Sequence, residues 1–236
     1  AQRLRDLLNM NQGRTKVLTI TSGKGGVGKS NFTINFALSL KSKGYDVVIF
    51  DADIGMANID VLMGVRPKYS LYHVLTRQKS LKEIMYQGHH GVKLIAGGSG
   101  FQDLLHLTEE QLEHFTSQIM TLHGQVDYIL FDTGAGLSKE TLKFILSADE
   151  TIIVTTPEPT AVTDAYALVK MIHQTGNQVP YQLVVNRVSD PREGQYTANK
   201  ISMAVKRFLN VDIQNLGFIQ DDPRVSKAVK NQIPFT

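Results

Sequence analysis

Apolar and polar positions alternate along the chain in two patterns, one of strand length and one of helix length. Short β-branched and aliphatic runs fit strands that are buried on both faces. These runs cover residues 17–20, 47–50, 92–95, 128–131, 151–154 and 181–185, with a further strand-like run at 216–219. Longer stretches with helical apolar spacing cover residues 30–43, 109–122, 161–175 and 196–209. Gly44 and Gly176 stand where helix C-caps are expected.

This alternation predicts an α/β protein with a mostly parallel, twisted β-sheet and helices on both of its faces. The 236 residues are enough for the core of one large domain, and no linker-like stretch divides them. Ligands of such sheets bind beyond the carboxyl ends of the strands. The chemistry of the chain is therefore expected in the segments that follow these strands.

The amino-acid composition excludes several classes of functional site. The sequence contains no cysteine, which excludes cysteine nucleophiles, disulfides, thiolate zinc sites and iron–sulfur ligation by this chain. The net charge of +3 is too small to indicate a nucleic acid or an anionic membrane as partner, although a basic patch assembled by the fold stays open. No apolar run approaches the roughly 18–20 residues needed to span a bilayer.

A phosphate-binding loop follows the first predicted strand and opens the first predicted helix. Residues 23–30 read Gly-Lys-Gly-Gly-Val-Gly-Lys-Ser, which is the P-loop pattern in the context that this motif requires. Its glycines let backbone N–H groups turn toward phosphate oxygens at a helix N-terminus. Lys29 is expected on the β- and γ-phosphates, and Ser30 on a magnesium ion. The predicted nucleotide contacts in this segment are Gly25, Gly26, Val27, Gly28, Lys29, Ser30 and Asn31.

A second lysine, Lys24, stands at the front of the loop. Lys29 already supplies the cation that a bound nucleotide needs within one subunit. Lys24 makes most sense if it reaches phosphates bound by a facing copy of the same protein. The sequence therefore predicts a homodimer that forms with ATP.

Carboxylates follow two further strands. Asp51 and Asp53 are two residues apart at a strand end, so their side chains point to the same side. Facing a nucleotide, one can hold a magnesium-bound water and the other can orient the attacking water. Asp132 follows four apolar strand residues, which is a Walker B arrangement and predicts contact with magnesium through water.

The last predicted strands end in residues suited to a nucleobase. The amide of Asn186 can pair with the edge of an adenine, and Arg187 can stack on the ring or join the dimer. The run at 216–219 leads to a turn that would close the adenine pocket. We therefore include Ile219 and Asp221 among the predicted nucleotide contacts.

Together these residues resemble the MinD/ParA class of deviant Walker A ATPases, over residues 16–234. The motifs that carry the resemblance are KGGVGKS at residues 24–30, DADIGMANID at 51–60 and FDTGAG at 131–136. Within this class, the segments at residues 55–60, 95–100 and 157–161 are similar to the FlhG family, also called YlxH or FleN, which regulates flagellar number and placement. The resemblance implies a single-domain P-loop NTPase over residues 15–236.

The resemblance also implies roles for the candidate residues. ATP and magnesium drive a face-to-face homodimer, and hydrolysis to ADP and phosphate returns monomers. In this scheme Lys24 acts in trans and Asp53 polarises the attacking water. Asp51 and Asp132 assist magnesium, beside the expected ligand Ser30.

Partners and location are likewise expectations from the resemblance. Residues 1–14 are similar to a segment through which this family stimulates FlhF, a GTPase of the signal-recognition-particle type. The residues concerned are Gln2, Arg3, Leu4, Arg5 and Leu7. Flagellar switch (C-ring) proteins are further expected partners, and the family cycles between the cytoplasm and the membrane. Because its membrane-binding C-terminal helix is not found before Thr236, membrane binding by this chain is expected only with that helix.

Other interpretations remain beside this one. The leucines of the N-terminal segment also suit a short helix that lies on its own core rather than on a partner. A ParA-type DNA-partitioning ATPase is the main alternative function, although the small net charge argues against it and no specific nucleic acid is expected. A small-molecule synthetase would need a substrate pocket beside the γ-phosphate, and no residues suggest one.

Overall fold

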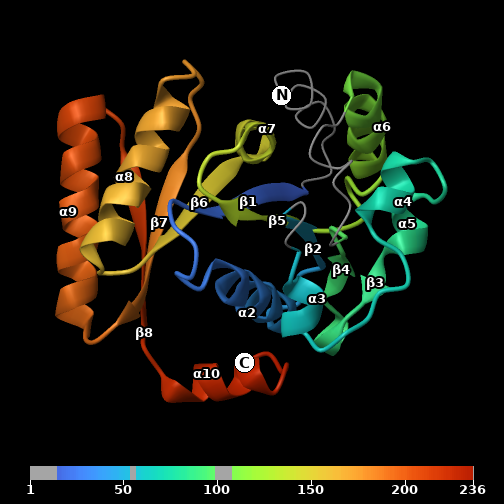
Figure 1. Cartoon of the computed structure of the whole chain (residues 1–236), viewed down its shortest axis with the longest axis horizontal. Coiled ribbons are helices and arrows are strands. Elements are labelled where there is room, and N and C mark those ends of the chain that lie inside the picture. Colours follow the sequence, from blue (N-terminus) through green and yellow to red (C-terminus); the bar gives the residue numbers. More distant parts are fainter. Residues whose placement is uncertain (1–14, 54–56, 99–107, 236) are drawn as a thin grey trace.

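The computed structural model describes residues 15–53, 57–98 and 108–235. Its strands form one sheet of eight, shown in Figure 1. In spatial order they are β3 (Tyr86–Gln87), β4 (Lys93–Ile95), β2 (Val47–Ala52), β5 (Tyr128–Ala135), β1 (Lys16–Ser22), β6 (Glu150–Thr155), β7 (Tyr181–Val188) and β8 (Ile213–Gln220). All neighbouring pairs are parallel except β3 with β4. The predicted mostly parallel sheet is confirmed.

Helices connect these strands, and a last one follows β8. They are α2 (Lys29–Ser42), α3 (Ile59–Leu62), α4 (Leu71–Leu75), α5 (Leu81–Ile84), α6 (Glu109–Met120), α7 (Lys139–Ser147), α8 (Pro159–His173), α9 (Pro191–Leu209) and α10 (Pro223–Lys230), with a 3₁₀ turn, η1 (His89–Gly91). Gly44 and Gly176 have positive φ values of 92° and 75° beyond α2 and α8. Gly44 directly follows the C-cap residue Lys43, as predicted, whereas Gly176 lies two residues after Gln174, the C-cap residue of α8.

Alternate residues of the central strands face opposite layers of helices. Leu18, Ile20, Ile49 and Leu130 pack with the buried residues of α2 and α3. Their chain neighbours Val48, Phe50, Ile129 and Phe131 pack against α4, α5 and α6, while the strand residues of β6 and β7 also meet α7, α8 and α9. Figure 1 shows α2 on one side of the sheet and α6, α7, α8 and α9 on the other. Helices therefore cover both faces, as predicted.

Capping residues fix helix starts that apolar spacing alone misplaces. Apolar spacing predicts a helix from Tyr196, but α9 begins at Pro191. The Asp190 carboxylate accepts hydrogen bonds from the N–H groups of Arg192 and Glu193, and proline suits the first helical position because its φ is already helical. The helices α7 and α10, which no predicted helix covers, also begin after caps of this kind, at Ser138 and Asp222.

This topology gathers the candidate residues at one edge of the sheet. In the β2–β5 pairing Asp51 lies opposite Asp132, and in the β1–β5 pairing Ile20 does. The P-loop leaves the adjacent end of β1. The N-terminal segment 1–14 lies outside the described residues, as do residues 54–56 of the second motif and residues 99–100 of the segment 95–100. Within the described part, no helix combines the length and apolar character that crossing a membrane requires.

Candidate nucleotide-binding site

The P-loop runs from the end of β1 at Ser22 to the start of α2 at Lys29. Gly28 adopts a φ of 90°, and a Cβ placed there would lie 2.4 Å from Nδ2 of Asn186. Glycine suits this position because of its backbone conformation, and a larger residue would also have to displace the Asn186 amide. The amide of Asn186 in turn donates to the carbonyl of Val27 at 2.8 Å, which ties the end of β7 to the loop.

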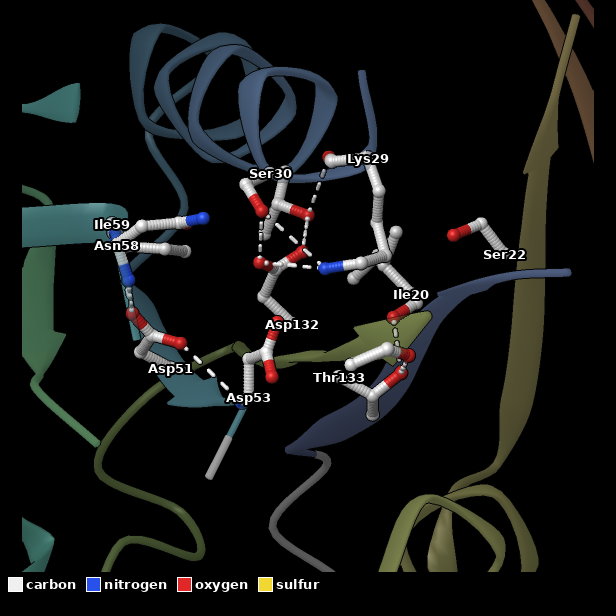
Figure 2. A network of polar contacts seen from close by, with 12 residues as sticks. Ile20, Ser22, Lys29, Ser30, Asp51, Asp53, Asn58, Ile59, Asp132 and Thr133 are labelled. Carbon is white, nitrogen blue, oxygen red and sulfur yellow. Dashed lines mark hydrogen bonds and ion pairs between the residues drawn. The ribbon is translucent and has the colours of Figure 1, made fainter. Parts of the chain in front are cut away.

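Asp132 is the centre of a buried polar network at the foot of the loop (Figure 2). Nζ of Lys29 lies 2.9 Å from its Oδ2, and the Ser30 hydroxyl donates to the same oxygen at 2.6 Å. The hydroxyl of Thr33, one turn along α2, donates to Oδ1 at 2.7 Å. Every one of these groups compensates the carboxylate for the loss of water.

The two carboxylates at the end of β2 have different surroundings. Asp53 lines the cavity beside the P-loop, and burial raises its pKa, with the charge of Lys29 partly opposing the rise. Asp51 is buried, and burial together with the charge of Asp132 raises its pKa to about 7. The Asp51 carboxylate accepts hydrogen bonds from the N–H groups of Asn58 and Ile59. Figure 2 shows the Asp51 side chain directed to Asn58 and Ile59, with its other oxygen near the main-chain nitrogen of Asp53.

The predicted adenine contacts share one cavity with the P-loop. This cavity has a volume of about 1240 Å³ and extends from the loop past α2 to α10. Asn186, Arg187, Ile219 and Asp221 all line it. Nε of Arg187 lies 3.7 Å from Oδ1 of Asp221, so the ends of β7 and β8 meet across the wall. The P-loop contacts Gly25, Gly26, Val27, Gly28, Lys29, Ser30 and Asn31 line the same space.

Lys24 is directed to another part of the molecule. Its ammonium group donates to Oε2 of Glu158 at 3.0 Å and to the hydroxyl of Thr160 at 2.9 Å. These two residues flank Pro159, the first residue of α8. The side chain of Lys24 is 38% exposed and does not contribute to the described lining of the cavity.

The donors at the foot of the loop fit magnesium. The Ser30 hydroxyl and the Asp132 carboxylate are hard oxygen donors, the kind that magnesium prefers, and lie 2.6 Å apart. Ser30 would hold the ion directly and Asp132 through water, with nucleotide phosphates completing the set. Such an ion supplies positive charge that neutralises the phosphate oxygens.

Three residues of this site escaped prediction from the sequence. Thr33 reaches Asp132 because it lies one helical turn after Lys29, a spacing that was available in the sequence. Asn58 lines the cavity, and Glu158 pairs with Lys24. Both lie in segments that carry the family resemblance, at residues 51–60 and 157–161, but the sequence does not show which neighbour each one meets.

Comparison with known proteins identifies the family. A model of the ParA family, described as NUBPL iron-transfer P-loop NTPase, matches residues 13–234. The chain belongs to the ParA family of P-loop NTPases. It is accordingly an ATPase, and the predicted MinD/ParA class is confirmed. The 236-residue sequence contains no cysteine that could ligate an iron–sulfur cluster.

Individual members of the ParA family are similar over most of the chain. The antiactivator FleN of Pseudomonas aeruginosa is 36% identical over 217 residues, which are 92% of this chain and 78% of that protein. The flagellum site-determining protein YlxH of Helicobacter pylori is 39% identical over an alignment of 242 positions, gaps included, which covers 98% of this chain and 81% of that protein. Among solved structures, the septum site-determining protein MinD of Pyrococcus horikoshii, complexed with Mg-ADP, aligns with a TM-score of 0.77 and 27% identity over 94% of this chain and 87% of that one.

Proposed function

We propose that this ATPase is an ATP-driven dimerisation switch that controls flagellar number and placement. The names of two similar proteins support the flagellar role, since one is an antiactivator and the other a flagellum site-determining protein. Both align with more than nine-tenths of this chain. The fold shared with MinD supports the nucleotide cycle.

The position of Lys24 is the observation that carries the switch. Within its own subunit Lys29 pairs with Asp132 beneath the P-loop, while Lys24 contacts two residues at the start of α8. The Lys24 side chain is partly exposed, and an exposed ion pair with Glu158 is worth little, so the ammonium can exchange partners at small cost. In the proposed dimer it exchanges them for the phosphates of the facing subunit.

Hydrolysis ends the dimeric state in this proposal. Asp53 lies at the cavity between the P-loop and β5, and burial raises its pKa, which makes its carboxylate a better proton acceptor for water. Loss of the γ-phosphate removes the charge that holds Lys24 across the interface. Monomers with ADP then separate.

The remaining steps of the cycle concern partners. We propose that the ATP dimer associates with the membrane and that the monomer returns to the cytoplasm. The N-terminal segment, through Gln2, Arg3, Leu4, Arg5 and Leu7, is proposed to stimulate the GTPase FlhF. Flagellar switch proteins are the third class of proposed partner.

The mass of Asp53→Ala in solution tests the switch. Light scattering is recorded with ADP and then with ATP and magnesium, since blocked hydrolysis should trap the dimer. We expect a monomer with ADP and a doubled mass with ATP. The double variant Lys24→Ala/Asp53→Ala should bind ATP yet stay monomeric, while Lys43→Ala/Asp53→Ala, which removes an exposed lysine at the far end of α2, should still dimerise.

Two outcomes would contradict the proposal at different points. An ATP-bound Asp53→Ala that stays monomeric argues against the switch as a whole. A dimer in the Lys24→Ala/Asp53→Ala variant argues against the role of Lys24 alone. The flagellar role is tested by counting flagella in cells whose only copy of the protein is the Lys24→Ala variant. We expect these cells to have the same abnormal number of flagella as cells that lack the protein altogether.

A further inference from the structure

Asp51 makes contacts that differ from those of a metal-site carboxylate. Its side chain is 2% exposed. Its Oδ2 accepts the N–H groups of Asn58 at 2.8 Å and Ile59 at 2.9 Å, and its Oδ1 lies 3.4 Å from the N–H of Asp53. All three donors are main-chain groups of the segment that follows β2.

The neighbouring carboxylate, Asp132, lies on the side of the site where Ser30 would hold magnesium. Asp132 lies opposite Asp51 in the sheet register, and Lys29 and Ser30 of α2 converge on it. Asp53 and Asn58 line the cavity, whereas Asp51 lies beneath its described lining. Figure 2 shows Asp51 turned toward the start of α3 and Asp132 toward α2.

We propose that Asp51 is a positioning residue, which holds both ends of the segment from Asp53 to Ile59 through their main-chain N–H groups and thereby places Asp53 for hydrolysis. This replaces the magnesium-assisting role predicted from its position beside a P-loop. The inference rests on the proposed catalytic function of Asp53. Asp51 itself contacts neither substrate nor the reacting water in this assignment.

The packing is tight around Asp51 and around Ala57, near the two ends of this segment. A Cβ built on Gly97, which follows β4, would lie 2.4 Å from the Asp51 carbonyl oxygen and 3.3 Å from Cβ of Ala57. The chain beyond β4 therefore packs closely against both the end of β2 and Ala57. If the Asp51 acceptor is removed, the buried N–H of Ile59 loses its partner, and the segment has to shift to regain one.

The variants Asp51→Asn and Asp51→Ala separate positioning from metal binding. One oxygen, Oδ2, accepts from both Asn58 and Ile59, so an asparagine can place its single oxygen there and keep the hold. Alanine cannot. Displacement of a catalytic group by about 1 Å can cost on the order of 10²-fold in rate. We expect kcat to fall at least about tenfold in Asp51→Ala and to stay within about threefold of wild type in Asp51→Asn.

Magnesium dependence supplies the decisive readout. Positioning predicts that the magnesium concentration for half-maximal ATPase activity and the affinity for ADP are the same in both variants as in wild type. Amide hydrogen exchange should show lost protection at Asn58 and Ile59 in Asp51→Ala only. A wild-type kcat in Asp51→Ala overturns the proposal. So does an Asp51→Asn protein that loses activity together with a raised magnesium requirement, and this second result decides the matter even where Asp51→Ala does not fold.

A separate variant distinguishes failure of the underlying function. Asp53→Ala should abolish hydrolysis whatever happens at Asp51. Hydrolysis at the wild-type rate in Asp53→Ala means that the catalytic assignment of Asp53 is wrong. If Asp53→Ala abolishes hydrolysis as expected, but Asp51→Asn is inactive and has a raised magnesium requirement, only the positioning role of Asp51 is overturned.

Discussion

At the scale of single residues, Thr33 shows how strongly the Walker B carboxylate depends on neutral donors. The Thr33 side chain is buried, and its hydroxyl lies 2.7 Å from Oδ1 of Asp132. Thr33→Val keeps the shape but removes this hydrogen bond to a buried charge, which is worth about 1.5–3 kcal/mol. We expect the free energy of unfolding in urea to fall by about that amount. Nucleotide binding should persist, because Lys29 and Ser30 still hold the other oxygen.

An exposed threonine on another helix provides the matched control. Thr163 on α8 donates to the carbonyl of Pro159 at 2.9 Å, on the protein surface. Thr163→Val should change the free energy of unfolding by no more than about 0.5 kcal/mol. Equal losses in the two variants would mean that the Asp132 contact is not the source of the effect.

Lys29 carries the complementary residue-scale prediction. Its ammonium is the only described cation within the Asp132 network, and P-loop binding relies on the same group. Lys29→Ala should abolish ATP and ADP binding, measured by isothermal titration, while Lys43→Ala binds normally. Normal nucleotide affinity in Lys29→Ala would refute the P-loop assignment.

At the scale of elements, the helix α5 depends on a capping box. The N–H of Ser80 and the ammonium of Lys79 both bond to the Glu83 carboxylate, and the Ser80 contact above all lowers the pKa of Glu83 to about 2, from an ordinary 4.5. A folded-state pKa below the unfolded one stabilises the fold above about pH 4.5, and this contribution is lost as the pH falls toward 2.

Glu83→Gln removes the charge that gives this pH dependence. We expect a lower Tm than wild type at neutral pH and a difference that shrinks as the pH is lowered from 5 to 2, followed by circular dichroism. Glu110→Gln removes a surface ion pair with Arg77 at 2.8 Å and serves as the control. A difference between Glu83→Gln and wild type that is constant with pH would show that the carboxylate charge does not stabilise α5.

The sequence predicts those strands and helices whose burial leaves a periodic pattern of apolar residues. Strands buried on both faces were predicted correctly because they appear in the sequence as continuous apolar runs. Helices that bury one stripe were predicted because their apolar residues recur at helical spacing. The start of α9 was missed because its polar cap extends the helix beyond its apolar residues, and α7 and α10 were not predicted at all. Short α3, α4 and α5 and the antiparallel β3 have too few residues to show a period.

At the scale of the whole molecule, the site is predictable where its residues are linked through strand ends. Lys29, Ser30 and Asp132 could be placed together because a parallel sheet brings the carboxyl ends of its strands to one edge. The pairing of Lys24 with Glu158 could not, because it joins the loop to a helix 134 residues away that has no nucleotide motif. Sequence motifs thus locate the nucleotide, while the contacts that regulate it depend on the fold.

ATP hydrolysis and dimerisation should therefore depend on the described ATPase domain, and stimulation of FlhF on the N-terminal segment. The P-loop, the carboxylates Asp51, Asp53 and Asp132, and the cavity wall all lie within the described residues. A chain without residues 1–9 should hydrolyse ATP and dimerise as before but lose stimulation of the purified FlhF GTPase, followed by phosphate release from GTP. A synthetic peptide of residues 1–14 should restore it, whereas a peptide with Leu4 and Leu7 changed to serine should not. Full stimulation by the shortened chain would assign the contact to the ATPase domain, and lost ATPase activity would make the segment part of the fold.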